Sequence, residues 1–273
     1  MSQSTKVRAA LIAVLFGSAA LVMAGVRSTV APASFERTAS PETKARQIID
    51  RAIAAHGGRQ VWREKKDAAF STTWTHYKDG ELSFRSRYLV KFPIAAGAAV
   101  AIVEAEENGK PVVMGVSGSS SWFLIGAERY EDLESLKTNR AFVRRVYGLL
   151  ALPFCLEEPG YTAVYDGEEV RAGAVVDRVR VERGLEPPGL YLFDRETGRL
   201  VGMGSPVSDP PTATVGDADD FTTVEGILIP RTRRFDKIDQ LTGSRARALE
   251  VSVDLVRFDN GFGPETFEPP PVR

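Results

Sequence analysis

The sequence predicts an α+β fold in which a curved antiparallel sheet forms an unclosed half β-barrel and helices cover its concave face. Three observations support this prediction. Apolar and polar residues alternate with a period of two through most of the chain, short turn motifs join these segments, and two stretches show helical spacing instead. Hairpin connections make the strands antiparallel, and a sheet of about 11 strands must curl. The two helices are then available to cover the concave side.

The first helix is expected at residues 41–56. Ser40 has the side chain of a helix N-cap, Pro41 suits the first helical position, and Glu42 places an acid in the first turn. The apolar residues that follow recur at helical spacing and are Ala45, Ile48, Ile49, Ala52 and Ile53. Gly57-Gly58 ends the helix, because glycine readily adopts the left-handed conformation.

Strand patterns begin at residue 67. Asp79-Gly80 and Asn108-Gly109 have the sequence of tight hairpin turns, so residues 98–106 and 111–117 are expected to pair. The alternation separates an apolar side from a polar side, which indicates a sheet with one buried face.

A second helix is expected at residues 131–151, with a break near Thr138-Asn139. Its apolar residues form one stripe, and Pro153 follows its end. This stripe needs a partner surface, so the helix is expected to lie over the concave side of the sheet.

Strand patterns resume at residue 161 and continue to residue 255. Glu225-Gly226 predicts another hairpin. Residues 205–218 contain three prolines and several small polar residues, so they are expected to form a loop.

The N-terminus has the sequence of an export signal. Lys6 and Arg8 precede an apolar run from Ala9 to Val26, so residues 1–26 are expected to be a signal peptide. The chain is therefore expected in the periplasm or outside the cell. An uncleaved leader that anchors the chain in the inner membrane remains the alternative.

Cleavage of the leader is expected after Ala24 or after Ala33, since small residues flank both positions. Residues 27–40 are then a polar linker, and residues 41–273 form a single domain.

The composition argues against several functional classes. The 35 basic and 36 acidic residues give a net charge of −1, which provides no basic surface for nucleic acid. Cys155 is the only cysteine and cannot form an internal disulfide. Two histidines offer little material for a zinc site, and no cofactor is expected.

Several residues resemble parts of reactive or metal sites, but each has a simpler interpretation. They are His56, His76, Glu104, Glu106, Glu107, residues 117–121, Cys155, Asp217, Asp219 and Asp220. The first histidine is expected to end a helix, the second to be exposed on a strand, and the cysteine to be buried. No nucleophile, base and acid form a recognisable set, so no enzymatic activity is predicted.

Aromatic side chains are the strongest candidates for a binding surface. Six of them are expected to share one side of the sheet and the facing helix stripe, and these are Phe70, Trp74, Phe84, Tyr88, Phe142 and Tyr147. They either fill an ordinary core or line a cavity for an apolar ligand, and both interpretations remain open.

Four segments resemble the Lol-type periplasmic lipoprotein carriers and their relatives. They are Ala54 to Gly58 followed by Trp62, Tyr191 to Gly198, Val224 to Pro230, and Phe262 to Pro269. Leu152-Pro153-Phe154 with Glu158-Pro159-Gly160 resembles one bacterial branch of that group. The resemblance covers most of residues 41–269. It implies an eleven-strand unclosed barrel with helices over its concave face, a cavity for acyl chains, and no catalytic residue.

Three functions follow from these observations. The first is a non-catalytic cell-envelope protein that binds a lipid or a lipoprotein acyl chain. The second is a periplasmic interaction or sensor domain that has a filled core and binds another envelope protein. The third is an unrecognised hydrolase. An apolar cavity would favour the lipid-binding protein. A filled core with an exposed apolar patch would favour the interaction domain. A polar cleft with converging acids or histidines would favour the hydrolase.

Overall fold

The computed structural model describes residues 39–183, 188–205, 212–239 and 241–269. The signal peptide expected at residues 1–26 lies outside this part of the chain, as does most of the linker expected at residues 27–40. Among the described residues, no helix is both long enough and apolar enough to cross a membrane.

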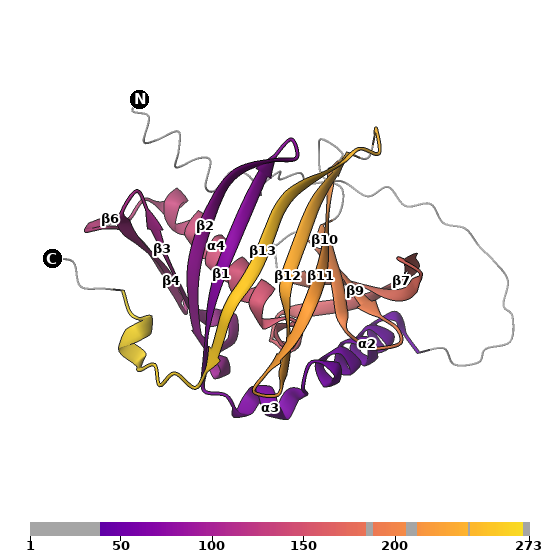
Figure 1. Cartoon of the computed structure of the whole chain (residues 1–273). Helices are drawn as coiled ribbons and strands as arrows, with labels where there is room; N and C mark the ends of the chain where they lie inside the picture. The colour runs from indigo at the N-terminus through magenta and orange to yellow at the C-terminus, as the bar shows by residue number, and fades with distance from the viewer. Residues whose placement is uncertain (1–38, 184–187, 206–211, 240, 270–273) are drawn as a thin grey trace, which may run out of the picture.

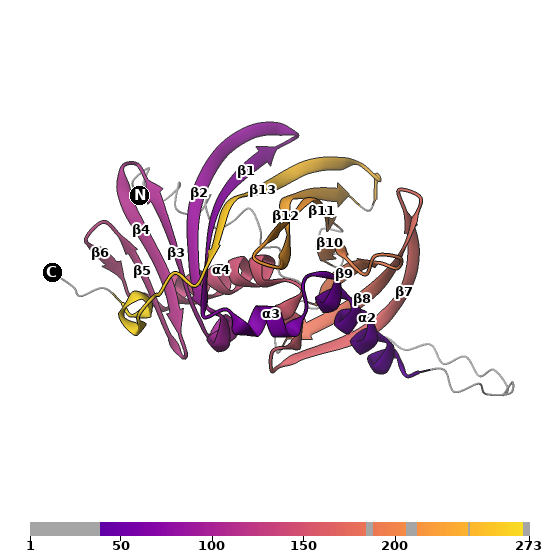
Figure 2. The same ribbon diagram turned by 60° about the horizontal axis from the view of Figure 1, so that its bottom comes forward.

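Thirteen strands of the described residues form one antiparallel sheet in the order β6-β5-β4-β3-β2-β1-β13-β12-β11-β10-β9-β8-β7 (Figure 1). Strands β6 and β7 are its two edges, and the sheet curves without closing (Figure 2). The strands are β1 (Asp67–Lys78), β2 (Glu81–Pro93), β3 (Val100–Glu107), β4 (Lys110–Ser117), β5 (Ser120–Ile125), β6 (Glu128–Tyr130), β7 (Tyr161–Arg171), β8 (Ala174–Arg183), β9 (Gly189–Asp194), β10 (Leu200–Ser205), β11 (Thr212–Val224), β12 (Ile227–Asp239) and β13 (Arg245–Phe258).

Helix α4 (Leu133–Ala151) crosses the concave side because it connects the two edges of the sheet (Figures 1 and 2). It follows β6 at one edge, packs on β2 to β5, and precedes β7 at the other edge. The carboxylate of Asp132 accepts a hydrogen bond from the Ser135 N–H at 2.8 Å and caps the first turn. The predicted position of this helix is confirmed.

Helices α2 (Pro41–Ala55) and α3 (Arg59–Glu64) lie at the lower end of the sheet in Figure 1. Ser40 caps α2 as predicted, since its hydroxyl oxygen accepts the Thr43 N–H at 3.3 Å. One face of α2 packs against β7. Three short 3₁₀ helices complete the described fold, namely η1 (Ile94–Ala99), η2 (Phe154–Glu157) and η3 (Pro264–Phe267).

The prediction of about 11 strands was too low. Strand β6 has only three residues, so its sequence shows no alternation. Residues 212–218, predicted as part of a loop, form the first half of β11 instead. This half pairs with β10 and β12 on either side, and such long-range pairing leaves no local sequence pattern. Residues 206–211 lie outside the described part of the chain.

The break predicted near Thr138-Asn139 is also wrong, because α4 is continuous. Asparagine weakens helices when its side chain binds its own backbone. Here the Asn139 amide is buried and donates instead to the carbonyl oxygens of Trp122, at 2.8 Å, and Gly115, at 3.3 Å. These bonds tie α4 to β4 and β5.

The main core lies on the concave side, between the sheet and its helices. A smaller cluster lies on the opposite side of β3 to β5. There Ile102, Gly115 and Trp122 form one cross-strand row, and Phe267 of η3 covers it. Gly115 leaves the space that the indole occupies, since a Cβ atom there would lie 2.1 Å from the Trp122 ring. The two clusters are therefore separated by the sheet.

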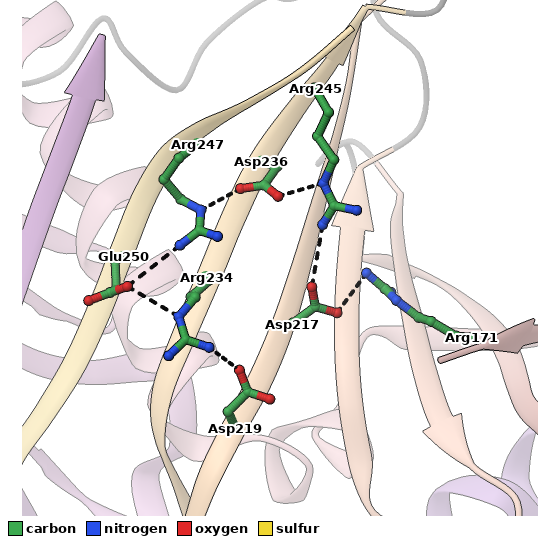
Figure 3. A network of polar contacts seen from close by, with 8 residues as sticks. All are labelled: Arg171, Asp217, Asp219, Arg234, Asp236, Arg245, Arg247 and Glu250. Carbon is green, nitrogen blue, oxygen red and sulfur yellow. Dashed lines mark hydrogen bonds and ion pairs between the residues drawn. The ribbon is translucent and has the colours of Figure 1, made fainter. Parts of the chain in front are cut away.

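The convex face of β11 to β13 carries a network of ion pairs (Figure 3). Arg234 binds the carboxylates of both Asp219 and Glu250. Asp236 accepts hydrogen bonds from Arg245 and Arg247. Burial alone would raise the pKa of Asp236, but these two guanidinium groups outweigh it and lower the pKa. Charges on this face are thus matched on neighbouring strands.

Candidate functional site: the concave face

Strand register places one row of side chains across the middle of the concave face. Trp74 of β1 lies opposite Val251 of β13, which lies opposite Arg233 of β12, and Arg233 lies opposite Ala218 of β11. Directly opposite residues point to the same side of a sheet. This row therefore joins a predicted aromatic candidate to an arginine in the interior.

Three of the six predicted aromatic residues form one cluster between the sheet and α4. Trp74 lies 5.4 Å from Tyr88 and 6.0 Å from Phe142, measured between ring centroids, and the other two rings are 5.7 Å apart. Trp74 and Tyr88 are buried, whereas Phe142 of α4 is half-buried. The structure thus brings together residues from β1, β2 and the covering helix.

Phe70 and Tyr147 belong to a second group. Both rings contact Phe92, with centroid distances of 5.7 Å and 4.8 Å. The Tyr147 hydroxyl donates a hydrogen bond to Glu158, and burial raises the pKa of this tyrosine above its usual value. Fully buried rings in mutual contact are typical of a packed core. These two candidates therefore have the surroundings of structural residues.

Phe84, the sixth candidate, lies near the β1–β2 hairpin and stacks on His76 at 4.2 Å. His76 was predicted to be exposed, and this is wrong, since only 6% of it is accessible. Both residues point to the concave side, where the Phe84 ring covers the imidazole, and burial lowers the pKa of His76. Phe84 itself remains half-buried, so this end of the aromatic surface is the more open one.

Two hollows in the described part of the molecule are open and mainly polar. The larger, of about 640 Å³, lies on the convex face and is lined by residues such as Thr73, Arg87 and Glu250. The smaller, of about 290 Å³, lies between α2 and β8. None of the six aromatic candidates lines either hollow. The aromatic rings of the concave face contact one another instead.

Arg233 is a residue that sequence reasoning missed. It is 2% exposed, and none of its three side-chain nitrogens has a hydrogen-bond partner among the described residues. Burial lowers the pKa of the guanidinium to about 10, so the group is still a cation at neutral pH. A buried charge without a partner destabilises a protein by several kcal/mol. The signal was present in β12, where Arg233 shares its strand phase with Ile229 and Phe235.

His56 and Cys155 interact electrostatically with Arg233 but offer it no negative charge. The Nδ1 atom of His56 lies 2.8 Å from the Leu228 carbonyl oxygen, and its Nε2 atom accepts the Leu200 N–H at 3.2 Å. Burial lowers the pKa of His56 to about 4, so the imidazole is neutral. Burial likewise raises the pKa of the Cys155 thiol. His56 ends α2 as predicted, and it also ties the helix to β10 and β12.

Four of the remaining sequence candidates, Asp217, Asp219, Glu104 and Cys155, have ordinary partners. Asp217 and Asp219 pair with arginines on the convex face (Figure 3). Glu104 pairs with Lys91 at 2.7 Å. Cys155 is buried, and its sulfur lies 3.5 Å from the Gly148 carbonyl oxygen. None of these contacts forms a nucleophile–base pair.

The described fold is similar to two solved structures from bacterial proteins. A domain from Vibrio parahaemolyticus assigned to outer membrane lipoprotein sorting aligns over 82% of this chain and 96% of its own, with a TM-score of 0.53 and 12% identity. A LolA superfamily protein from Nitrosomonas europaea aligns over 82% and 97%, with the same score and identity. The sequence matches no family model and no curated protein. The predicted resemblance is thus confirmed for the fold, which is LolA-like.

Proposed function

From this LolA-like fold, we propose that the protein is a non-catalytic cell-envelope protein that binds a lipid or a lipoprotein acyl chain on the concave face of its sheet. The observation that carries the proposal is the cluster of Trp74, Tyr88 and Phe142, which lies between the unclosed sheet and α4. Its rings come from both the sheet and the covering helix. These rings pack against one another, so binding requires α4 to move away from the sheet and expose an apolar surface that an acyl chain could cover.

The energetics favour an acyl chain as the ligand. Burial of one CH₂ group contributes about 0.8 kcal/mol, so a chain of ordinary length can offset the contacts that α4 loses when it moves. The half-buried Phe142 loses less apolar burial in such a movement than the fully buried Tyr147. We therefore propose that the acyl chain enters near Phe142 and Phe84 rather than near the fully buried Tyr147 and Phe92.

The three tryptophans provide a positional test. Trp74 lies in the proposed binding surface, and Trp122 lies on the opposite side of the sheet. Trp62 lies in the main core, where its ring centroid is 4.4 Å from that of Phe154. Bromine quenches tryptophan fluorescence only at short range. A fatty acid brominated along its chain should therefore quench Trp74 first.

The experiment compares Trp74→Phe, Trp122→Phe and Trp62→Phe by titration with brominated stearate. Quenching should persist in the second and third variants and largely disappear in Trp74→Phe, while unbrominated stearate should leave fluorescence unquenched in all. Quenching that survives in Trp74→Phe would move the site elsewhere. No binding to any of these folded proteins would contradict the proposal and favour the interaction domain with a filled core.

Export is part of the proposal and rests on the sequence of residues 1–26. N-terminal sequencing of the exported protein should begin at Gly25 or Ser34, after cleavage at Ala24 or Ala33. Recovery of intact Met1 in the membrane fraction would replace cleavage with anchoring.

A further inference from the structure

We infer that Arg233 binds the oxyanion head group of the amphiphile, so that the ligand is an acyl compound with a carboxylate or phosphate rather than a neutral lipid. This inference rests on the proposed function and specifies the chemistry of its ligand. Two adjacent arginines on β12 point to opposite sides of the sheet. Arg233 points to the concave side, and Arg234 points to the convex side.

The two arginines differ in their partners. Arg234 is half-exposed and contacts two carboxylates, Asp219 and Glu250 (Figure 3). Arg233 is almost fully buried, yet within the described ranges all three of its side-chain nitrogens lack a hydrogen-bond acceptor. Buried charges in proteins are normally paired. The site is therefore complete only when an acceptor is added.

The residues around Arg233 do not supply that acceptor. The two ring nitrogens of His56 are engaged with backbone groups of Leu228 and Leu200. Glu158, which interacts with the nearby Cys155, accepts hydrogen bonds from Tyr147 and from the Ala98 N–H. Opposite Arg233 on the neighbouring strands are only Ala218 and Val251. A ligand oxyanion would meet no competing carboxylate in these contacts.

The geometry also connects this cation to the aromatic cluster. Arg233 and Trp74 lie in the same cross-strand row with Val251 between them. Two strand spacings separate their backbones by roughly 10 Å. A head group bound by Arg233 would thus leave its acyl chain beside Trp74 and Phe142. The planar guanidinium can form two parallel hydrogen bonds to a carboxylate or phosphate, and neither an alcohol nor a quaternary amine accepts both.

Three probes with matched chains test the inference. Binding of dodecanoate, dodecyl phosphate and 1-dodecanol is measured by calorimetry with the wild-type protein and with Arg233→Met and Arg234→Met. Methionine replaces the unbranched aliphatic part of the arginine side chain without its charge, and Arg234→Met is the matched control on the adjacent residue. Urea unfolding checks each variant, and Arg233→Met should be at least as stable as the wild type because it removes an uncompensated charge.

The wild type should bind the two anionic probes at least tenfold more tightly than 1-dodecanol. Arg233→Met should bind all three with similar affinity, and Arg234→Met should keep the preference. Equal affinities in the wild type, or a preference that persists in Arg233→Met, would overturn the inference while the proposed function stands. If acetate competes with dodecanoate and 1-dodecanol does not bind at all, the site binds small anions. That result would overturn the role proposed for the acyl chain. Failure of every probe to bind would reject the proposed function itself.

Discussion

The neutral state of His56 makes the free energy of unfolding depend on pH. Its pKa is about 4 in the folded protein, mainly because burial disfavours the imidazolium, against 6.5 for the unperturbed group. One pKa unit corresponds to about 1.4 kcal/mol, so the full difference is about 3 kcal/mol. Between these two pKa values the unfolded chain binds a proton that the folded chain does not. The contribution of the neutral imidazole to the free energy of unfolding is therefore fully present above about pH 6.5, and it is lost as the pH falls toward 4.

The test compares the wild type with His56→Gln, which keeps a polar amide at this position but cannot ionise. Urea unfolding at pH 7 and pH 5 should show that the wild type loses about 2 kcal/mol more than the variant over this range. His76 remains in both proteins, so its own contribution cancels in the difference. At pH 7 the variant should be less stable, because it cannot reproduce both hydrogen bonds to Leu228 and Leu200. An identical pH dependence in the two proteins would refute the assignment of His56 as a buried neutral group.

Three substitutions test the packing on which the site depends, each by urea unfolding. Tyr147→Ala should cost about 3–5 kcal/mol, because a buried ring that contacts Phe92 is removed; a cost below about 1 kcal/mol would mean that this region is not a filled core. Gly57→Ala should cost more than about 1 kcal/mol, since φ is +113° and the added Cβ would lie 2.1 Å from the Gly226 carbonyl oxygen. Gly148→Ala in α4 should instead gain about 0.5–1 kcal/mol, since among the described residues no atom beyond the adjacent residues and the local helix backbone lies within 4 Å of the added Cβ; a loss there would argue against the continuous helix.

Elements with strong local signals could be predicted from the sequence. Ser40, Pro41 and the double glycine at 57–58 define α2 almost to the residue. Asn108-Gly109 defines the β3–β4 hairpin, because two consecutive residues there adopt positive φ angles. The first half of β11 could not be predicted, because its glycine, aspartate and alanine residues have low strand propensity. It forms a strand only because β10 and β12 pair with it.

The arrangement of the candidate site was predictable in part. The alternation of β1 and β2 correctly indicated that Trp74 and Tyr88 share a face, and the stripe of α4 brought Phe142 to them. Tyr147 belongs to the packed core rather than to this cluster because its ring contacts Phe92. Sequence patterns do not reveal such contacts. The phase of Arg233 was visible in the sequence, but its lack of a partner depends on β11 and β13, which only the folded sheet brings beside it.

The most direct measurement is native mass spectrometry of the full protein purified from its own cell envelope. We expect a mass above that of the bare chain. Collisional activation should release the bound species, an acyl compound with a carboxylate or phosphate head group. The released species should be lost from Arg233→Met and retained by Arg234→Met. A bare chain in the mass spectrum, together with no fatty-acid binding by the folded protein in solution, would contradict the central claim that the concave face binds an amphiphile.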